Sequence, residues 1–136
     1  MNENFEHLLQ TRNIKPTAMR LLVYDQLRRH KKALSLIDIE QLFNKVDRST
    51  IFRTLKLFQK NGIIHSIDDG TGSIKYALCD EGCTCRGEDL HVHFLCIKCT
   101  QTFCLRHIPI PLINLPDSFN FTEANFVVKG VCSDCI

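Results

Sequence analysis

The sequence predicts an α+β fold in which closely spaced helices and a β-hairpin precede a small antiparallel β region. Two observations support this division. Residues 1–78 carry 13 Lys and Arg against 8 Asp and Glu, a net charge of +5, whereas residues 79–136 carry 4 against 7, a net charge of −3. All eight cysteines lie in the second half. A chain of 136 residues suits one or two small domains, and we place the boundary near Leu78, between 1–78 and 79–136.

The first half contains helix patterns whose ends can be read from the sequence. Apolar residues at helical spacing predict a short helix over residues 4–12. Thr17 is suited to cap a second helix. Ser35 and Asp38 have the spacing of a capping box, so another helix is expected over residues 36–44. That helix would bury its apolar residues, which are Leu36, Ile39, Leu42 and Phe43.

The next helix, expected over residues 48–60, has an apolar face and a basic face. Asp47 or Ser49 would cap it, and Asn61-Gly62 would end it. At about 100° per residue, the core face comprises Ile51, Thr54, Leu55 and Phe58. The opposite face comprises Ser49, Phe52, Arg53, Lys56 and Lys60. A basic face is often merely solvated, but solvation does not explain an aromatic ring among the charges. Because this helix is the last of a closely spaced trio, it is expected to enter the major groove of double-stranded DNA.

Two apolar runs follow this helix. Residues 63–67 and 74–78 are joined by a segment rich in Gly and Asp, which is typical of a β-hairpin. Three helices followed by a hairpin predict a winged helix-turn-helix.

The second half has two overlapping ligand spacings within nine residues. His91-x-His93 places two imidazoles on one face of a strand, because strand side chains repeat every two residues. Cys96-x2-Cys99 is the spacing of a zinc knuckle, and Cys132-x2-Cys135 repeats it at the end of the chain. The two pairs predict one structural Zn(II) held by four thiolates.

The remainder of this half is expected to be an antiparallel sheet pinned by zinc, with little helix. Residues 102–107 and 126–131 have the pattern of strands. Pro109, Pro111 and Pro116 disfavour a long helix between them. Three further cysteines, Cys79, Cys83 and Cys85, directly follow the hairpin. Cys79, Cys83 and Cys104 are either ligands or small buried apolar residues, which free cysteines often are.

Composition excludes several classes of protein. No apolar stretch approaches the length of a membrane span, and the N-terminus lacks the apolar core of a signal peptide. A cytoplasmic location is therefore expected, where a disulfide framework is disfavoured and metal or redox chemistry better explains eight cysteines.

These motifs, in this order, resemble the ferric uptake regulator (Fur) family of metal-responsive repressors over nearly the whole chain. The matching segments are Ile14 to Arg20, Ser49 to Leu55, Asn61 to Ile64, His91 to Cys99 and Gly130 to Cys135. The resemblance implies a DNA-binding winged helix joined by a hinge to a dimerisation domain. It also implies a structural zinc held by four cysteines and a regulatory metal between the two domains.

The resemblance assigns roles to several residues. Phe52 stands where the family usually has a Tyr that contacts base edges, and Arg53, Lys15 and Arg20 match positions that meet DNA. Phe cannot donate the hydroxyl hydrogen bond of Tyr, so we expect apolar contact with thymine methyl groups and an A·T-rich operator. Because a homodimer presents two such helices, the operator should be a near-palindrome.

The regulatory site departs from the pattern of the iron sensors. His91 and His93 match its ligands, but Cys104 stands where those sensors have a carboxylate, and Cys79 or Cys85 replaces an acidic residue. The best additional ligands are Cys85 and Cys104, with Cys79 and His65 in reserve. His65 stands where zinc-sensing relatives often have a ligand. Thiolates favour Zn(II) over Fe(II) at this second site.

Two other function classes remain open on the sequence alone. Exposed thiols could form a disulfide that releases metal and DNA, which would make the protein a redox or peroxide-responsive regulator. A metalloenzyme would need an open zinc position beside an acid or base, and only Glu81, Glu88 and Asp89 lie near the histidines in sequence. We therefore expect a regulator and not an enzyme, with no small-molecule substrate.

Overall fold

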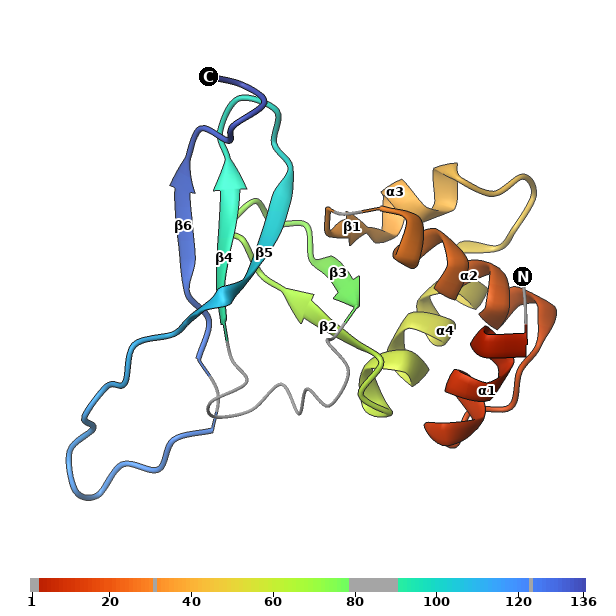
Figure 1. The fold of residues 1–136 in the computed structure, drawn as a ribbon, viewed down its shortest axis with the longest axis horizontal. Helices are drawn as coiled ribbons and strands as arrows, with labels where there is room; N and C mark the ends of the chain where they lie inside the picture. The colour runs from red at the N-terminus through yellow and green to blue at the C-terminus, as the bar shows by residue number, and fades with distance from the viewer. Residues whose placement is uncertain (1–2, 31, 79–90, 123) are drawn as a thin grey trace.

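The computed structural model describes residues 3–30, 32–78, 91–122 and 124–136. A group of helices lies at one end, a second sheet lies at the other, and the predicted hairpin lies between them (Figure 1). None of the helices in the described residues is long and apolar enough to cross a membrane. The elements in chain order are α1 (Glu3–Thr11), α2 (Ala18–Arg29), β1 (Leu34–Ser35), α3 (Leu36–Gln41), α4 (Arg48–Lys60), β2 (Ile64–Ile67), β3 (Lys75–Leu78), β4 (His91–Cys96), β5 (Thr102–Pro109) and β6 (Val127–Gly130).

The predicted helix caps are present. The side chain of Thr17 accepts a hydrogen bond from the backbone N–H of Arg20, and Ser35 and Asp38 form a reciprocal capping box. Asp47, and not Ser49, is the cap of α4, since its carboxylate accepts the backbone N–H of Ser49. These side chains bond N–H groups that the first turn of a helix leaves without a partner.

The end of α3 differs from the prediction. The helix stops at Gln41 and does not reach Asn44, because the N–H of Leu42 bonds to Ile39 and Glu40 in a tighter closing turn. Lys45 then takes a left-handed backbone conformation, with φ of 58°, which turns the chain toward α4. Leu42 is 40% exposed, so its predicted burial was wrong.

The helical half packs around one apolar cluster. The four residues expected on the core face of α4 are all buried: Ile51, Thr54, Leu55 and Phe58. Ile51, Leu55 and Phe58 share the cluster with residues of α1, α2, α3 and the first sheet, among them Leu9, Val23, Leu27, Ile39 and Ile64. Burial of side chains of this size stabilises a fold by roughly 1.5–3 kcal/mol each.

The first sheet has the order β1-β3-β2 and contains the predicted hairpin. Strands β2 and β3 pair antiparallel, with Ile64 opposite Leu78 and Ile67 opposite Lys75. The two-residue strand β1 adds a third member that was not expected from the sequence. The fold of this half is the predicted winged helix-turn-helix.

The second sheet has the order β5-β4-β6. Strands β4 and β5 are antiparallel, as expected, with His93 opposite Cys104. Strand β6 lies parallel to β4, so the expectation of a purely antiparallel sheet needs correction at this pair. Parallel neighbours require a long crossover. Here the crossover is the segment between β5 and β6, which projects away from the remainder of the chain (Figure 1).

Candidate metal centres and nucleic-acid interface

The two Cys-x2-Cys pairs meet at one end of the second sheet. Cys96 ends β4, Cys99 lies in the turn that follows, and Cys132 and Cys135 lie in the turn after β6. Parallel pairing places Cys96 opposite Gly130, which brings the second turn alongside the first. All four sulfur atoms lie within 4.8 Å of one another.

Gly130 lies in close contact with the Phe94 ring of β4. A Cβ atom at this position would lie 3.1 Å and 3.3 Å from two ring carbons of Phe94, closer than side chains normally pack. A larger residue would therefore require the Phe94 ring or strand β6 to shift by a few tenths of an ångström.

The backbone around Cys96 stabilises a thiolate. The N–H of Cys99 lies 3.5 Å from the Cys96 sulfur and the N–H of Cys132 lies 3.4 Å from it. These donors lower the pKa of the Cys96 thiol to about 6, against the opposing effect of burial. The neighbouring Cys132 thiol and burial raise the pKa of Cys135. Four thiols this close cannot all ionise without a cation among them.

The spacing of the sulfurs fits zinc. A tetrahedral zinc with bonds of about 2.3 Å places neighbouring sulfurs about 3.8 Å apart. The sulfurs of Cys99 and Cys132 lie 3.8 Å apart. The four cysteines could therefore hold one zinc ion with little rearrangement.

A second cluster joins the two sheets. It consists of His65 on β2, His91 and His93 on β4, and Cys104 on β5, whose ligand atoms all lie within 4.8 Å of one another. The rings of His91 and His93 have centroids 4.9 Å apart, and the His65 ring lies 5.2 Å and 5.5 Å from them. Of the residues in this cluster, only His65 comes from the winged-helix half.

His93 lies in a position that disfavours a charged ring. It is 8% exposed, and neither ring nitrogen has a hydrogen-bond partner among the described residues. Burial, with a smaller contribution from His65 and His91, lowers the pKa of His93 to about 4. A buried neutral imidazole with an unbonded nitrogen has the state that a metal ligand requires.

The distances in this cluster also fit a metal. A tetrahedral zinc bound by one imidazole and one thiolate places nitrogen and sulfur about 3.6 Å apart. Nε2 of His65 and the sulfur of Cys104 lie 3.5 Å apart. Three imidazoles and one thiol form the kind of mixed nitrogen and sulfur set that zinc accepts.

The structure brings together some of the candidate ligands and leaves others undescribed. His91, His93 and Cys104 lie together, and His65, which sequence reasoning held in reserve, lies with them. Cys79, Cys83 and Cys85 fall outside the described residues, so their candidacy stays a prediction. The same holds for Glu81, Glu88 and Asp89.

The outer face of α4 has the expected basic character. Ser49, Phe52, Arg53, Lys56 and Lys60 are all exposed. The Lys56 ammonium lies 5.2 Å from the centroid of the Phe52 ring, which is 40% exposed. The hydroxyl of Ser49 donates to the Asp47 carboxylate at 2.6 Å. This helix therefore presents cationic groups around an accessible aromatic ring.

Lys15 and Arg20 lie just before and at the start of α2. Lys15 is exposed, and the Arg20 guanidinium donates to the backbone carbonyl of Lys15 at 2.8 Å. This contact holds the Arg20 guanidinium against the backbone of Lys15. Such residues commonly bind phosphates of a nucleic acid.

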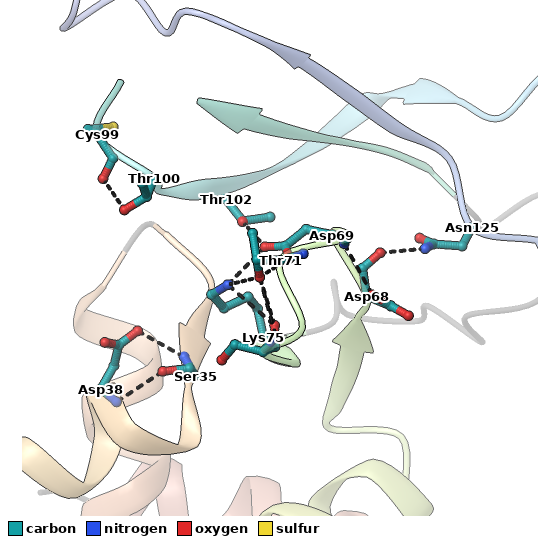
Figure 2. A network of polar contacts seen from close by, with 12 residues as sticks. Ser35, Asp38, Asp68, Asp69, Thr71, Lys75, Cys99, Thr100, Thr102 and Asn125 are labelled. Carbon is teal, nitrogen blue, oxygen red and sulfur yellow. Dashed lines mark hydrogen bonds and ion pairs between the residues drawn. The ribbon is translucent and has the colours of Figure 1, made fainter. Parts of the chain in front are cut away.

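A buried polar network between the two sheets was missed from the sequence. Asp69, in the turn between β2 and β3, accepts hydrogen bonds from Lys75 and Thr102 (Figure 2). Burial acts to raise the pKa of Asp69. Hydrogen bonds from Thr102, Thr71 and Lys75 outweigh this effect and hold the pKa well below its usual value. The one available signal was Lys75, a cation inside an otherwise apolar strand that would need an acidic partner if buried.

Comparisons with known proteins agree with the fold. A solved structure described as a zinc uptake regulator complexed with zinc and DNA has a TM-score of 0.69 at 19% identity, covering 97% of this chain and 90% of that chain. A zinc-bound manganese uptake regulator has a TM-score of 0.64 at 19% identity, covering 96% and 99%. The ferric uptake regulator of Vibrio cholerae has a TM-score of 0.62 at 16% identity, covering 93% and 98%.

At such identities these likenesses concern the fold alone. A comparison with curated protein sequences gives no match. The profile of the ferric uptake regulator family, in contrast, matches residues 11–114, which is more than half of the chain. The chain therefore belongs to the ferric uptake regulator family.

Proposed function

We propose that this chain is a Zn(II)-responsive transcriptional repressor that binds an A·T-rich, near-palindromic operator as a homodimer. Its family is one of metal-responsive transcriptional regulators, not of enzymes. The observation that carries the proposal is the cluster of His65, His91, His93 and Cys104, because its ligand atoms come from both sheets. A metal that links strands of both halves can change the orientation of the proposed DNA-binding helix α4 relative to the second sheet.

Cys96, Cys99, Cys132 and Cys135 are the proposed ligands of a structural Zn(II). Their sulfurs are already gathered in the turns of one sheet, and the N–H groups directed at Cys96 favour its thiolate form. Folding of this sheet and zinc binding should be coupled, because thiolates without a cation would repel or protonate.

The proposed regulatory site uses His65, His91, His93 and Cys104, with Cys79 and Cys85 as further candidates. When bound, a divalent ion would supply a link among side chains of β2, β4 and β5. Among the described residues, this cluster consists of imidazoles and a thiol and contains no carboxylate, which supports Zn(II) over Fe(II). The side chains then hold the wing against the second sheet and favour one orientation of the helical half.

In the proposed DNA complex, α4 enters the major groove. Ser49, Phe52 and Arg53 approach the bases, whereas the phosphates are met by Lys15, Arg20, Lys56 and Lys60. The exposed Phe52 ring supports apolar contact with thymine methyl groups, and hence an A·T-rich operator.

A second copy of the chain is the proposed partner of the other half. The segment around β5 and β6 exposes several large apolar side chains, among them Ile108, Leu112, Ile113, Phe119 and Phe121. Leu112 is 99% exposed, and clusters of exposed apolar residues commonly mark interfaces. The proposed domains are 1–78 and 79–136, supported by the observation that each sheet draws its strands from one side of Leu78.

Metal-dependent DNA binding tests this function. Purified protein would be analysed for zinc, depleted of its exchangeable metal with a mild chelator, and titrated onto an A·T-rich palindromic duplex with Zn(II), Fe(II) or Mn(II) added back. We expect Zn(II) to raise operator affinity about 5- to 150-fold, the usual range of allosteric coupling. Activation by Fe(II) alone would contradict the zinc assignment, and affinity unchanged by every metal would contradict the regulatory mechanism.

A thiol-based redox regulator is the second candidate. The sulfurs of Cys99 and Cys132 lie 3.8 Å apart, near enough that a two-electron oxidation by peroxide could join them with small movements. The two thiolates would lose two electrons to the peroxide, and the zinc they shared would be released. Operator affinity that stays constant under mild peroxide would rule against this candidate.

A further inference from the structure

A buried polar cluster lies where the wing meets the second sheet. The carboxylate of Asp69 accepts hydrogen bonds from Nζ of Lys75 at 2.9 Å and from the hydroxyl of Thr102 at 2.6 Å (Figure 2). It also accepts the backbone N–H of Thr71 at 3.1 Å. Asp69 is 1% exposed and Thr102 is fully buried. The charge of Asp69 is therefore removed from water and compensated within this cluster.

The contacts of Thr102 cross from one sheet to the other. Thr102 is the first residue of β5, whereas Asp69 belongs to the turn of the wing hairpin. The backbone carbonyl of Thr102 accepts the N–H of Ala33, the residue before β1, at 2.9 Å. Nearby, the Asn125 amide donates to the carbonyl of Asp68 at 2.6 Å. None of these bonds uses a histidine or a cysteine.

The polar cluster and the second metal cluster share the same two elements. Cys104 lies two residues after Thr102 on β5, so both side chains face the same side of the strand. His65 lies on β2, four residues before Asp69. The pair Asp69–Thr102 and the pair His65–Cys104 therefore bridge the same junction at neighbouring positions.

We propose that Asp69, Lys75 and Thr102 are positioning residues for the His65, His91, His93 and Cys104 site, which they assemble by holding β2 against β5. This role rests on the proposed metal function of that site. The polar cluster keeps His65 close to Cys104 whether or not a metal is bound. The ligands from the two sheets therefore lose little conformational freedom when the ion binds.

The chemistry of the cluster explains why it can hold the junction closed. Separating β2 from β5 removes the Thr102 hydroxyl from a buried carboxylate, and a charged group that loses a donor is costly to leave buried. The bond that Lys75 makes lies within the hairpin itself and would persist. Removing the Thr102 hydroxyl should therefore loosen the contact between β2 and β5 while the ion pair of Asp69 with Lys75 stays in place.

Two substitutions at Thr102 separate positioning from packing. Thr102→Val keeps the shape but removes the hydroxyl, whereas Thr102→Ser keeps the hydroxyl but removes a methyl group. Thr122→Val, at an exposed site between β5 and β6, is the matched control. The probe is Co(II) added to full-length protein that retains its structural zinc. Binding is followed by the thiolate-to-cobalt charge-transfer band and the ligand-field bands of tetrahedral Co(II).

We expect Thr102→Val to bind Co(II) about tenfold more weakly than wild type, the effect of losing a hydrogen bond to a charged group. Its spectrum at saturation should be unchanged, because all four ligands remain. Thr102→Ser and Thr122→Val should bind as wild type does. Equal affinity of Thr102→Val and wild type would overturn the positioning role. So would a weaker affinity of Thr102→Ser than of Thr102→Val, since packing would then be responsible.

The Cys104→Ser variant separates this inference from the function on which it rests. If the Co(II) charge-transfer band of Cys104→Ser is as intense as that of wild type, Cys104 is not a ligand, the proposed regulatory site is wrong, and the positioning role is overturned with it. If the band is weaker or absent in Cys104→Ser but Thr102→Val binds Co(II) as tightly as wild type, only the positioning role is overturned.

Discussion

The two candidate metal clusters differ in which parts of the chain supply their residues. Cys96, Cys99, Cys132 and Cys135 lie in two turns at one end of a single sheet. The other cluster draws on three strands and both sheets, with His65 contributed by the wing. A metal bound within one sheet would stabilise that sheet. A metal bound by a cluster that both sheets share would link the two halves directly.

The surroundings of the candidate ligand atoms also differ between the two clusters. In the cysteine cluster, backbone N–H groups are directed at the sulfur of Cys96 and prepare a thiolate. In the histidine cluster, His93 is buried and neither ring nitrogen has a hydrogen-bond partner among the described residues, a state that costs free energy until a ligand is bound. The first arrangement suits permanent binding, and the second suits binding that shifts an equilibrium between two arrangements.

The largest expected effect follows from breaking the cysteine cluster. Cys132→Ser should lose the structural zinc and leave the second sheet poorly folded or aggregating, since such sites contribute roughly 10–16 kcal/mol to folding. Zinc content and thermal melting followed by circular dichroism would measure this. Ser133→Ala, one residue away and exposed, is the control. Unchanged zinc content and melting in Cys132→Ser would refute the structural site.

Breaking the histidine cluster should be milder for the fold and decisive for regulation. The double variant His91→Ala/His93→Ala should keep its structural zinc and its melting behaviour but lose metal-stimulated DNA binding, a loss of about 1–3 kcal/mol in coupling. His107→Ala, exposed on the same sheet, should behave as wild type. If the double variant still responds to metal, the sensor lies elsewhere in the chain.

In the proposed DNA interface, Phe52→Ala should reduce the preference of the protein for its operator over other DNA sequences. The loss of apolar contact with thymine methyl groups should cost about 1–3 kcal/mol on the operator and little on random DNA. Fluorescence anisotropy with an A·T-rich palindrome and a scrambled duplex of equal length measures the difference. Equal losses on both duplexes would mean that α4 presents only an electrostatic surface.

The smallest effect is expected for Lys60→Ala. A phosphate contact contributes equally to all sequences, so affinity should fall alike on both duplexes and the salt slope should fall by about one unit. Salt titrations of wild type and variant provide the measurement. A salt slope equal to that of wild type would place Lys60 away from the phosphates.

The features that could be predicted from the sequence are those that depend on the spacing of residues close together in the chain. Helix α4 begins at Arg48 and ends at Lys60 as expected, because its cap, its apolar period and its terminal Gly62 are all encoded within 16 residues. The cysteine pairs were predictable for the same reason. What could not be predicted depends on contacts between distant segments, such as the parallel pairing of β6 and the bond between Asp69 and Thr102.

His65 shows this limit within the candidate site itself. In the sequence it is one histidine in an apolar strand, 26 residues from His91, and only the resemblance to zinc-sensing relatives suggested it as a ligand. Tertiary structure brings it beside Cys104. The candidate ligand that comes from the winged-helix half was therefore the one with the weakest local signal.

The zinc dependence of operator affinity in wild type and His65→Ala tests the central claim most directly. His65 is the proposed ligand that the wing contributes, and its replacement leaves all four cysteines of the proposed structural site in place. We predict that Zn(II) raises the operator affinity of wild type about 5- to 150-fold and leaves that of His65→Ala nearly unchanged. A full zinc response in His65→Ala, with equal structural zinc in both proteins, would contradict the claim that this cluster couples metal to DNA.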